Sequence, residues 1–223
     1  MIEIEIKSLL GDEKNANLLI EKLKNQDSDF RKKDESKQLN HYFINGKILD
    51  IADNLKHKIS DNQYQSIIDI EKKSSNYSVR TRQTDRETIL VIKATVDDTN
   101  SSNGTARLEN EIIFNDVNID FIDSIVLKSG FSYQAKWSRH RKEYHYKDIT
   151  VCIDKNAGYG YLAEFEKVVS RDENVDNVKQ MIRNELEVLE IEELSQEKLA
   201  KMFDYYNKNW MNYYGTEKTF VIE

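Results

Sequence analysis

The fold is decided by the stretch MIEIEIK, residues 1–7, in which apolar and charged side chains alternate without exception. In a β-strand, successive side chains leave opposite faces of the backbone. The three isoleucines therefore share one face, and Glu3, Glu5 and Lys7 share the other. A single strand of this kind is usually an edge strand with a solvated outer face. Only a repetition of the pattern along the chain favours another interpretation.

The same spacing of like charges returns in later segments that have strand-like alternation. The pairs are Arg80 and Arg82, Glu109 and Glu111, Arg139 and Arg141, and Glu164 and Glu166, with Lys93 near the end of a further alternating run. Ordinary solvated strands mix charges with Ser, Thr and Gln, whereas these pairs each carry one sign. Such strands suggest a surface that holds a highly charged ligand. A closed sheet with these faces turned inward would provide that surface.

Composition limits the class of protein. The 223 residues suit one domain with a sizeable core. The 33 basic residues are outnumbered by 40 acidic ones and form no long basic run, so we expect no nucleic-acid partner. No signal segment or apolar run of roughly 18 residues is present, so we expect a cytoplasmic protein without a membrane partner. The single cysteine, Cys152, excludes an internal disulfide and a cysteine metal cluster.

Turn and periodicity signals divide the chain into roughly eight short strands interrupted by helices. Asn45-Gly46 predicts a hairpin turn between strands at 38–43 and 47–51. Helical spacing predicts a helix at 13–25, which would cover the isoleucine face of the first strand. The segment 53–74 is also helical, and its polarity suggests an exposed insertion. We expect the aromatic residues of the last helix to pack against the outside of the sheet.

These elements predict an α+β fold. We expect an eight-stranded antiparallel closed β-barrel, forming a tunnel, with helices packed outside it over residues 1–171. Residues 172–223 would form a C-terminal helical extension packed on the barrel. Eight is the number of strands at which a sheet can close on a small interior.

The ordered series of charged motifs resembles the signature of the CYTH superfamily, which includes class IV adenylyl cyclases and thiamine triphosphatases. Its members are also called triphosphate tunnel metalloenzymes. Residues 3–7 match the ExExK motif, which alone would be a weak signal. The other motifs follow in the same order: Arg80-Thr-Arg82, Leu90-Val-Ile-Lys93, Glu109-Asn-Glu111, Arg139-His-Arg141, Asp154 and Glu164-Phe-Glu166. The series covers about three quarters of the chain and is therefore specific.

The resemblance implies a tunnel that holds divalent cations and a triphosphate. Carboxylates are ligands that Mg2+ or Mn2+ prefers, and the planar fork of arginine fits phosphate oxygens. The expected metal ligands are Glu3, Glu5, Asp154, Glu164 and Glu166. The expected phosphate-binding residues are Lys7, Arg80, Arg82, Lys93, Arg139 and Arg141. Glu109 and Glu111 are expected either to bind metal or to hold Arg80 or Arg82 in place.

These motifs do not determine which group attacks the phosphate. Lys7 and Glu5 are the expected catalytic residues, with Lys7 orienting or deprotonating the nucleophile. If water attacks, the protein is a triphosphatase acting on inorganic triphosphate, ATP or thiamine triphosphate, which is the interpretation we favour. If the ribose hydroxyl of ATP attacks, it is an adenylyl cyclase that makes cyclic AMP and pyrophosphate. A non-catalytic triphosphate or polyphosphate binder is the alternative of another class.

Overall fold

The computed structural model describes residues 2–73, 77–95, 106–170 and 173–222, with the side chains of 2, 95 and 106–109 outside the description. Eight strands and six α-helices lie in these ranges. In chain order they are β1 (Ile2–Gly11), α1 (Glu13–Gln26), β2 (Arg31–Ile44), α2 (Ile48–Leu55), α3 (Asp61–Lys73), β3 (Tyr77–Gln83), β4 (Thr88–Thr95), β5 (Ala106–Phe114), α4 (Ile119–Lys128), β6 (Ser132–Tyr146), β7 (Ile149–Asn156), β8 (Gly160–Val169), α5 (Val175–Val188) and α6 (Gln196–Asn209).

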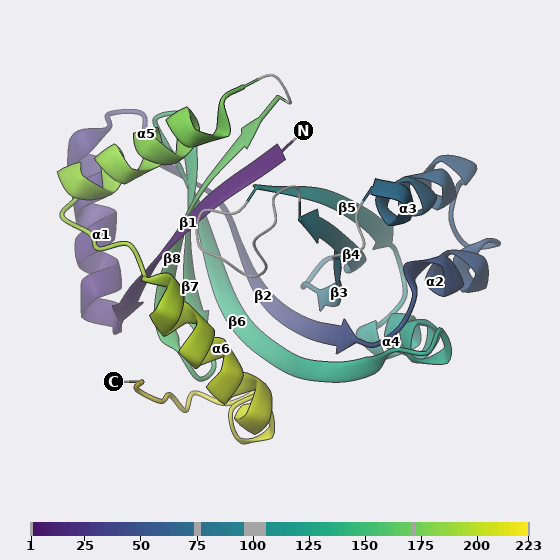
Figure 1. The fold of residues 1–223 in the computed structure, drawn as a ribbon. Helices are drawn as coiled ribbons and strands as arrows, with labels where there is room; N and C mark the ends of the chain where they lie inside the picture. The colour runs from purple at the N-terminus through teal and green to yellow at the C-terminus, as the bar shows by residue number, and fades with distance from the viewer. Residues whose placement is uncertain (1, 74–76, 96–105, 171–172, 223) are drawn as a thin grey trace.

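The strands form one antiparallel sheet that curves round an interior space (Figure 1). Their order is β1-β5-β4-β3-β2-β6-β7-β8, and β8 pairs with β1 along nearly the whole of that strand. On its other side, β1 pairs with β5 at only two positions. The predicted α+β class, strand number and antiparallel pairing are confirmed. Complete closure of the barrel by hydrogen bonds stays a prediction.

The isoleucine face of β1 is covered by helices, as the alternation predicts. Ile4 and Ile6 are fully buried in one core cluster with Leu19 and Leu23 of α1. Asp12 caps this helix, because its side chain accepts a hydrogen bond from the backbone N–H of Asn15. Residues of α5 complete the same core. Burial of this face turns Glu3, Glu5 and Lys7 toward the interior of the curved sheet.

The predicted strand at 47–51 is wrong. Asn45 has a positive φ of 75°, as a tight turn allows, but the chain continues into α2 instead of a returning strand. Four apolar residues at helical spacing decide this, because they are all buried in one core cluster: Ile48, Ile51, Ala52 and Leu55. The strand before the turn is also longer than predicted and begins at Arg31.

The segment 53–74 is not the single exposed helix that its polarity suggests. Within the described residues it contains the end of α2, a link at 56–60 and the whole of α3. Ile67 and Ile70 of α3 are buried in the core cluster that also contains Val79 of β3 and Ile92 of β4. Helices α2, α3 and α4 lie together on one side of the sheet in Figure 1. They pack against β3, the strand that carries Arg80 and Arg82, and against its neighbours β4 and β5.

The C-terminal residues are fastened to the sheet at several points. The backbone N–H of Leu194 donates to the carbonyl of Lys7 at 2.8 Å. Tyr206 is fully buried, and its hydroxyl donates to the carbonyl of Lys136 at 2.9 Å. The division of the chain between residues 171 and 172 stays a prediction. Within the described ranges, no helix combines the length and the apolar character that a membrane crossing requires.

Candidate active site

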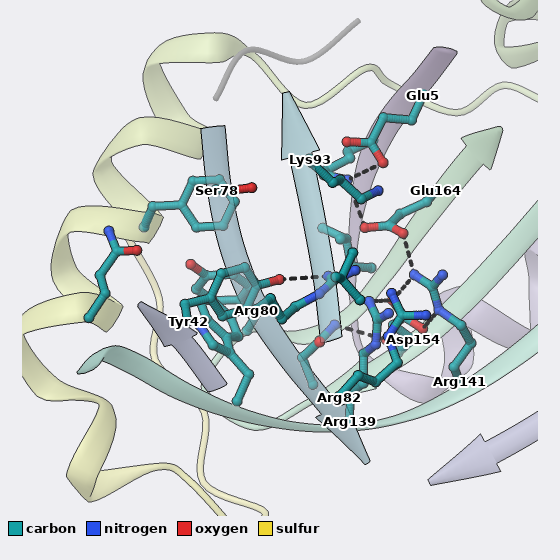
Figure 2. Close-up of a pocket in the computed structure, with 18 of the residues that line it drawn as sticks. Glu5, Tyr42, Ser78, Arg80, Arg82, Lys93, Arg139, Arg141, Asp154 and Glu164 are labelled. Atoms are coloured by element: carbon teal, nitrogen blue, oxygen red, sulfur yellow. Dashed lines mark hydrogen bonds and ion pairs between the residues drawn. The ribbon is translucent and has the colours of Figure 1, made fainter. Parts of the chain in front are cut away.

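A cavity of about 700 Å³ lies inside the curved sheet. Its wall is built from the inward faces of the strands, with a contribution from α6. The cavity gathers every residue that the sequence singles out for phosphate, metal or catalysis, apart from Glu109, whose side chain lies outside the described residues. Figure 2 shows arginines from β3 and β6 pointing into this space toward carboxylates from β1, β7 and β8. The roles of these residues stay predictions.

Three carboxylates form a cluster at β1 and β8. Oxygens of Glu3, Glu5 and Glu166 lie within 4.8 Å of one another. The pairing of Glu5 with Glu166 between neighbouring strands accounts for this closeness. Burial, together with the nearby charges of Glu164, Glu3 and Glu5, raises the pKa of Glu166 to about 8, although Arg141 opposes the rise. A divalent cation with hard oxygen ligands would relieve this crowding, so the cluster fits Mg2+ or Mn2+.

The other two predicted metal ligands are held by arginines. Asp154 is fully buried and accepts two hydrogen bonds from Arg141, at 2.8 and 2.7 Å, and one from Arg139 at 2.8 Å. The pairing of Arg141 with Asp154 between β6 and β7 brings these groups together. Glu164 accepts from Arg141 and, at 2.7 Å, from Lys7. The structure therefore does not place Asp154 and Glu164 in the three-carboxylate cluster.

Lys7 joins the two carboxylate groups. Its Nζ lies 2.7 Å from Oε1 of Glu164 and 3.2 Å from Oε2 of Glu5. Burial opposes the charge on Lys7, but the carboxylates of Glu164 and Glu5 outweigh it and hold the pKa of Lys7 above its ordinary value. Burial alone would raise the pKa of Glu164, but the positive charges of Lys7, Arg141 and Arg139 hold it well below its ordinary value. Lys7 is therefore suited to donate hydrogen bonds and poorly suited to accept a proton.

The positive charge of Arg82 on β3 is balanced less completely than that of Arg141. Nη1 of Arg82 donates to Glu111 at 3.2 Å, and Nε of Arg82 is buried without a hydrogen-bond partner among the described residues. Burial and the nearby charges of Arg80 and Arg139 lower the pKa of Arg82 to about 10. An anion bound between these arginines would reverse that effect, because phosphate oxygens accept from guanidinium groups.

Two further predicted residues, Lys93 and Glu111, contact the carboxylate cluster and Arg82, respectively. Nζ of Lys93 donates to Oε2 of Glu3 at 2.8 Å, so that this lysine contacts the carboxylate cluster. Glu111 is exposed over more than a third of its side chain and contacts Arg82. Of the two roles expected for Glu111, positioning Arg82 is the one that this contact supports.

Several residues of the cavity escaped the sequence analysis. The Tyr42 hydroxyl lines the cavity and accepts a hydrogen bond from Nη1 of Arg80 at 2.9 Å. Gln38 does not line the cavity, but it accepts a hydrogen bond from Nε of Arg139 at 2.8 Å. Both lie on β2, four residues apart and therefore on one face, and this even spacing was a usable signal. The described part of α6 lines the cavity with Leu199, Phe203 and Asn207, and none of its lysines does so.

Solved structures with this fold come from several organisms. A protein from Pyrococcus horikoshii is 16% identical, with a TM-score of 0.59 over 85% of this chain and 91% of that one. A candidate adenylate cyclase from Vibrio parahaemolyticus is 10% identical, with a TM-score of 0.56 over 90% and 98%. A candidate adenylyl cyclase from Hippeastrum, described as having a dominant triphosphatase activity, is 17% identical, with a TM-score of 0.50 over 86% and 89%.

Family membership is decided by the sequence. No curated protein matches the chain. The model of the CYTH domain, however, matches residues 1–199, which include β1 to β8 and extend into α6. The chain belongs to the CYTH domain family.

Proposed function

We propose that the protein is a metal-dependent triphosphatase that holds its substrate inside the curved sheet. One observation carries this proposal. The Glu3, Glu5 and Glu166 cluster, which fits a divalent cation, lines the same cavity as Arg80 and Arg82, which suit an anion. A triphosphate with a bound cation carries both kinds of charge, so it complements both groups at once. The membership of the chain in the CYTH family supports the same substrate class.

Each group of residues has a separate task in this proposal. Glu3, Glu5 and Glu166 would hold Mg2+ or Mn2+, which when bound neutralises phosphate charge. Arg80, Arg82 and Arg139 would donate hydrogen bonds to phosphate oxygens and fix the chain of phosphates. Lys7 would remain protonated and contribute a further donor beside Glu5. Asp154 and Glu164 would hold Arg139, Arg141 and Lys7 in position, because their oxygens already accept from those side chains.

An adenylyl cyclase is the second candidate, and the names of related structures motivate it. The Vibrio parahaemolyticus protein is named as a candidate cyclase, whereas the Hippeastrum protein of similar name is described as predominantly a triphosphatase. Cyclisation and hydrolysis both need the triphosphate held against a metal, and they differ in the attacking oxygen. We favour hydrolysis because the Hippeastrum protein, although named as a candidate cyclase, is described as having a dominant triphosphatase activity.

Product analysis tests the proposal. The protein would be incubated with inorganic triphosphate, ATP and thiamine triphosphate, each with Mg2+ or Mn2+, and phosphate, pyrophosphate and cyclic AMP would be quantified. Release of phosphate that is lost on chelation supports the triphosphatase. Cyclic AMP with pyrophosphate would establish the cyclase instead. Absence of every product with all combinations would leave a triphosphate binder and contradict both enzyme proposals.

A further inference from the structure

Asn40 on β2 carries a buried amide without a hydrogen-bond partner. Its side chain belongs to a residue that is 2% exposed, and among the described residues neither Oδ1 nor Nδ2 has a partner. A buried amide in this state has lost its bonds to water without gaining others, which is unfavourable. Such a group in a folded protein needs an explanation, and a functional role at a binding site is one.

The strand pairing places this amide on the inner side of the sheet. Asn40 is paired with Arg82 of β3 and with Trp137 of β6, and both of these residues line the cavity. Paired residues of neighbouring antiparallel strands lie on the same face. Asn40 therefore faces inward and lies directly beside Arg82, although its own atoms are covered.

Arg82 has an unused donor at the same place. Its Nε is buried without a partner among the described residues, while its Nη1 donates to Glu111 at 3.2 Å. This contact is longer than the range of about 2.7–2.9 Å that is usual between charged groups. The side chain of Glu111 is 38% exposed, and ion pairs with exposed members contribute little. Arg82 can therefore leave Glu111 at small cost.

The same strand shows how an amide holds an arginine. Gln38, two residues from Asn40, is paired with Arg139 of β6, and its Oε1 accepts from Nε of that arginine at 2.8 Å. Nη1 of Arg139 then donates to Asp154 at 2.8 Å. An amide oxygen on Nε thus fixes the plane of the guanidinium group and leaves its terminal nitrogens for an anion. The corresponding contact between Asn40 and Arg82 is not made in the unliganded protein.

We infer that Asn40 makes this contact when a triphosphate is bound: its Oδ1 accepts from Nε of Arg82, whose terminal nitrogens turn from Glu111 to phosphate oxygens. This inference rests on the proposed function, which places a phosphate group beside Arg82. A phosphate oxygen alone would not satisfy Oδ1, because both atoms are acceptors. Nε of Arg82 is the neighbouring donor that lacks a partner. Asn40 is thus a positioning residue that acts on the substrate through Arg82.

The test uses Asn40→Leu, which replaces the amide by an apolar side chain of similar size. Because the amide has no partner in the unliganded protein, the melting temperature should stay unchanged or rise by about 2–4 °C. For the preferred compound among inorganic triphosphate, ATP and thiamine triphosphate, kcat/KM should nevertheless fall about 10–100-fold, since Arg82 is no longer held. A residue with a purely structural role would lose stability and turnover together.

Two variants guard this result. Asn40→Ala adds no atoms, so it should show the same loss of kcat/KM even if leucine fits poorly. Asn110→Leu makes the same change on the opposite face of the sheet, at an amide whose Nδ2 donates to Oγ of Ser66 at 2.8 Å. Because that hydrogen bond is lost, Asn110→Leu should lower the melting temperature and leave kcat/KM within about twofold.

A double variant tests whether Asn40 acts through Arg82. When Arg82→Gln has removed the guanidinium group, adding Asn40→Leu should lower kcat/KM by less than about threefold further, because both changes remove one shared interaction. Losses that multiply independently would overturn the inference, as would unchanged kcat/KM in Asn40→Leu. A fall in melting temperature in both Asn40 variants as large as that in Asn110→Leu would also overturn it.

Calorimetric binding of the same three compounds with Mg2+ separates this inference from the proposed function. If a compound is bound but not turned over, and binds about tenfold or more weakly to Asn40→Leu, the role of Asn40 is supported and the triphosphatase is not. If a compound is hydrolysed equally well by Asn40→Leu and the unaltered protein, the triphosphatase is supported and the role of Asn40 is not. Absence of binding by all three compounds would contradict both.

Discussion

The charged residues of the cavity differ between its two sides. On the side of β1, β6, β7 and β8, Lys7, Arg141, Asp154 and Glu164 contact one another, and each charge faces an opposite one. On the side of β3, Arg80 and Arg82 lie close enough for their charges to oppose each other, and Arg82 has a lowered pKa. The first group resembles a structural ion-pair network, whereas Arg82 in the second group has only a 3.2 Å contact with Glu111 and a buried Nε without a hydrogen-bond partner among the described residues. The charge of a side chain therefore does not by itself identify a binding residue. The oppositely charged side chains that it contacts must also be known.

The largest expected effect is on stability, at Asp154. Asp154→Ala would leave Arg139 and Arg141 buried without their shared carboxylate, at a cost of about 3–5 kcal/mol in the free energy of unfolding. Urea denaturation measures this cost. Asp148→Ala is the matched control, because Asp148 forms an exposed pair with Lys167, for which about 0–1 kcal/mol is expected. Equal costs for the two variants would show that Asp154 does not hold a buried structural network together.

Arg82 should affect activity rather than stability. Arg82→Gln removes a phosphate donor, and we expect kcat/KM for the preferred triphosphate to fall about 100-fold. The free energy of unfolding should stay unchanged or rise slightly, because Arg82 is crowded by like charges. Arg86→Gln changes an exposed arginine at the β3–β4 turn, paired with Asp34, and serves as the control. A marked loss of stability in Arg82→Gln would show that this arginine belongs with the structural network.

The carboxylate cluster is expected to respond to metal. Glu166→Gln keeps the shape of the side chain and removes a charged ligand, so Mn2+ affinity measured by calorimetry should fall about tenfold or more. Stability without metal should not fall, because the neighbouring carboxylates already oppose the charge on Glu166. Glu187→Gln, on the exposed face of α5, should bind Mn2+ as the unaltered protein does. Unchanged Mn2+ binding in Glu166→Gln would argue against the cluster as the metal site.

A hydrogen bond outside the cavity gives the smallest expected effect. His41 contacts Asp123 at 2.7 Å and the hydroxyl of Tyr214 at 2.8 Å, and thereby ties the chain after α6 to β2. Tyr214→Phe should lower the free energy of unfolding by about 1 kcal/mol, as loss of one such bond does. Activity with inorganic triphosphate should be unchanged. Tyr205→Phe, whose exposed hydroxyl contacts Tyr213, is the control for loss of a surface hydroxyl.

The alternation of the strands made much of the arrangement predictable. Period two places Glu3, Glu5 and Lys7 on one face, and Arg139 and Arg141 on one face, without any knowledge of neighbouring strands. Burial of the isoleucines then decides which face turns inward. The pairing between strands lies beyond this local information. The side chain of Asp154 could bind a metal ion or pair with an arginine. Its pairing with Arg141 depends on the register of β6 against β7, which the spacing within one strand does not determine.

Local signals also competed with one another. Asn45-Gly46 is a strong hairpin signal, and it outweighed the helical spacing of Ile48, Ile51 and Leu55 that follows it. Only the core around α2 shows which signal prevails. For α6, the sequence predicts an aromatic helix packed on the sheet, and Tyr206 does pack in this way. The same helix lines the cavity through Phe203, because its position at one end of the sheet exposes a second face to the interior.

Lys7 faces in two directions. Its ammonium group contacts Glu164 inside the cavity, while its carbonyl accepts the hydrogen bond from Leu194 just before α6. One residue thus links the ion pairs of the cavity to the segment that leads into α6. The position of this segment therefore depends on the backbone of β1, whose side chains line the cavity.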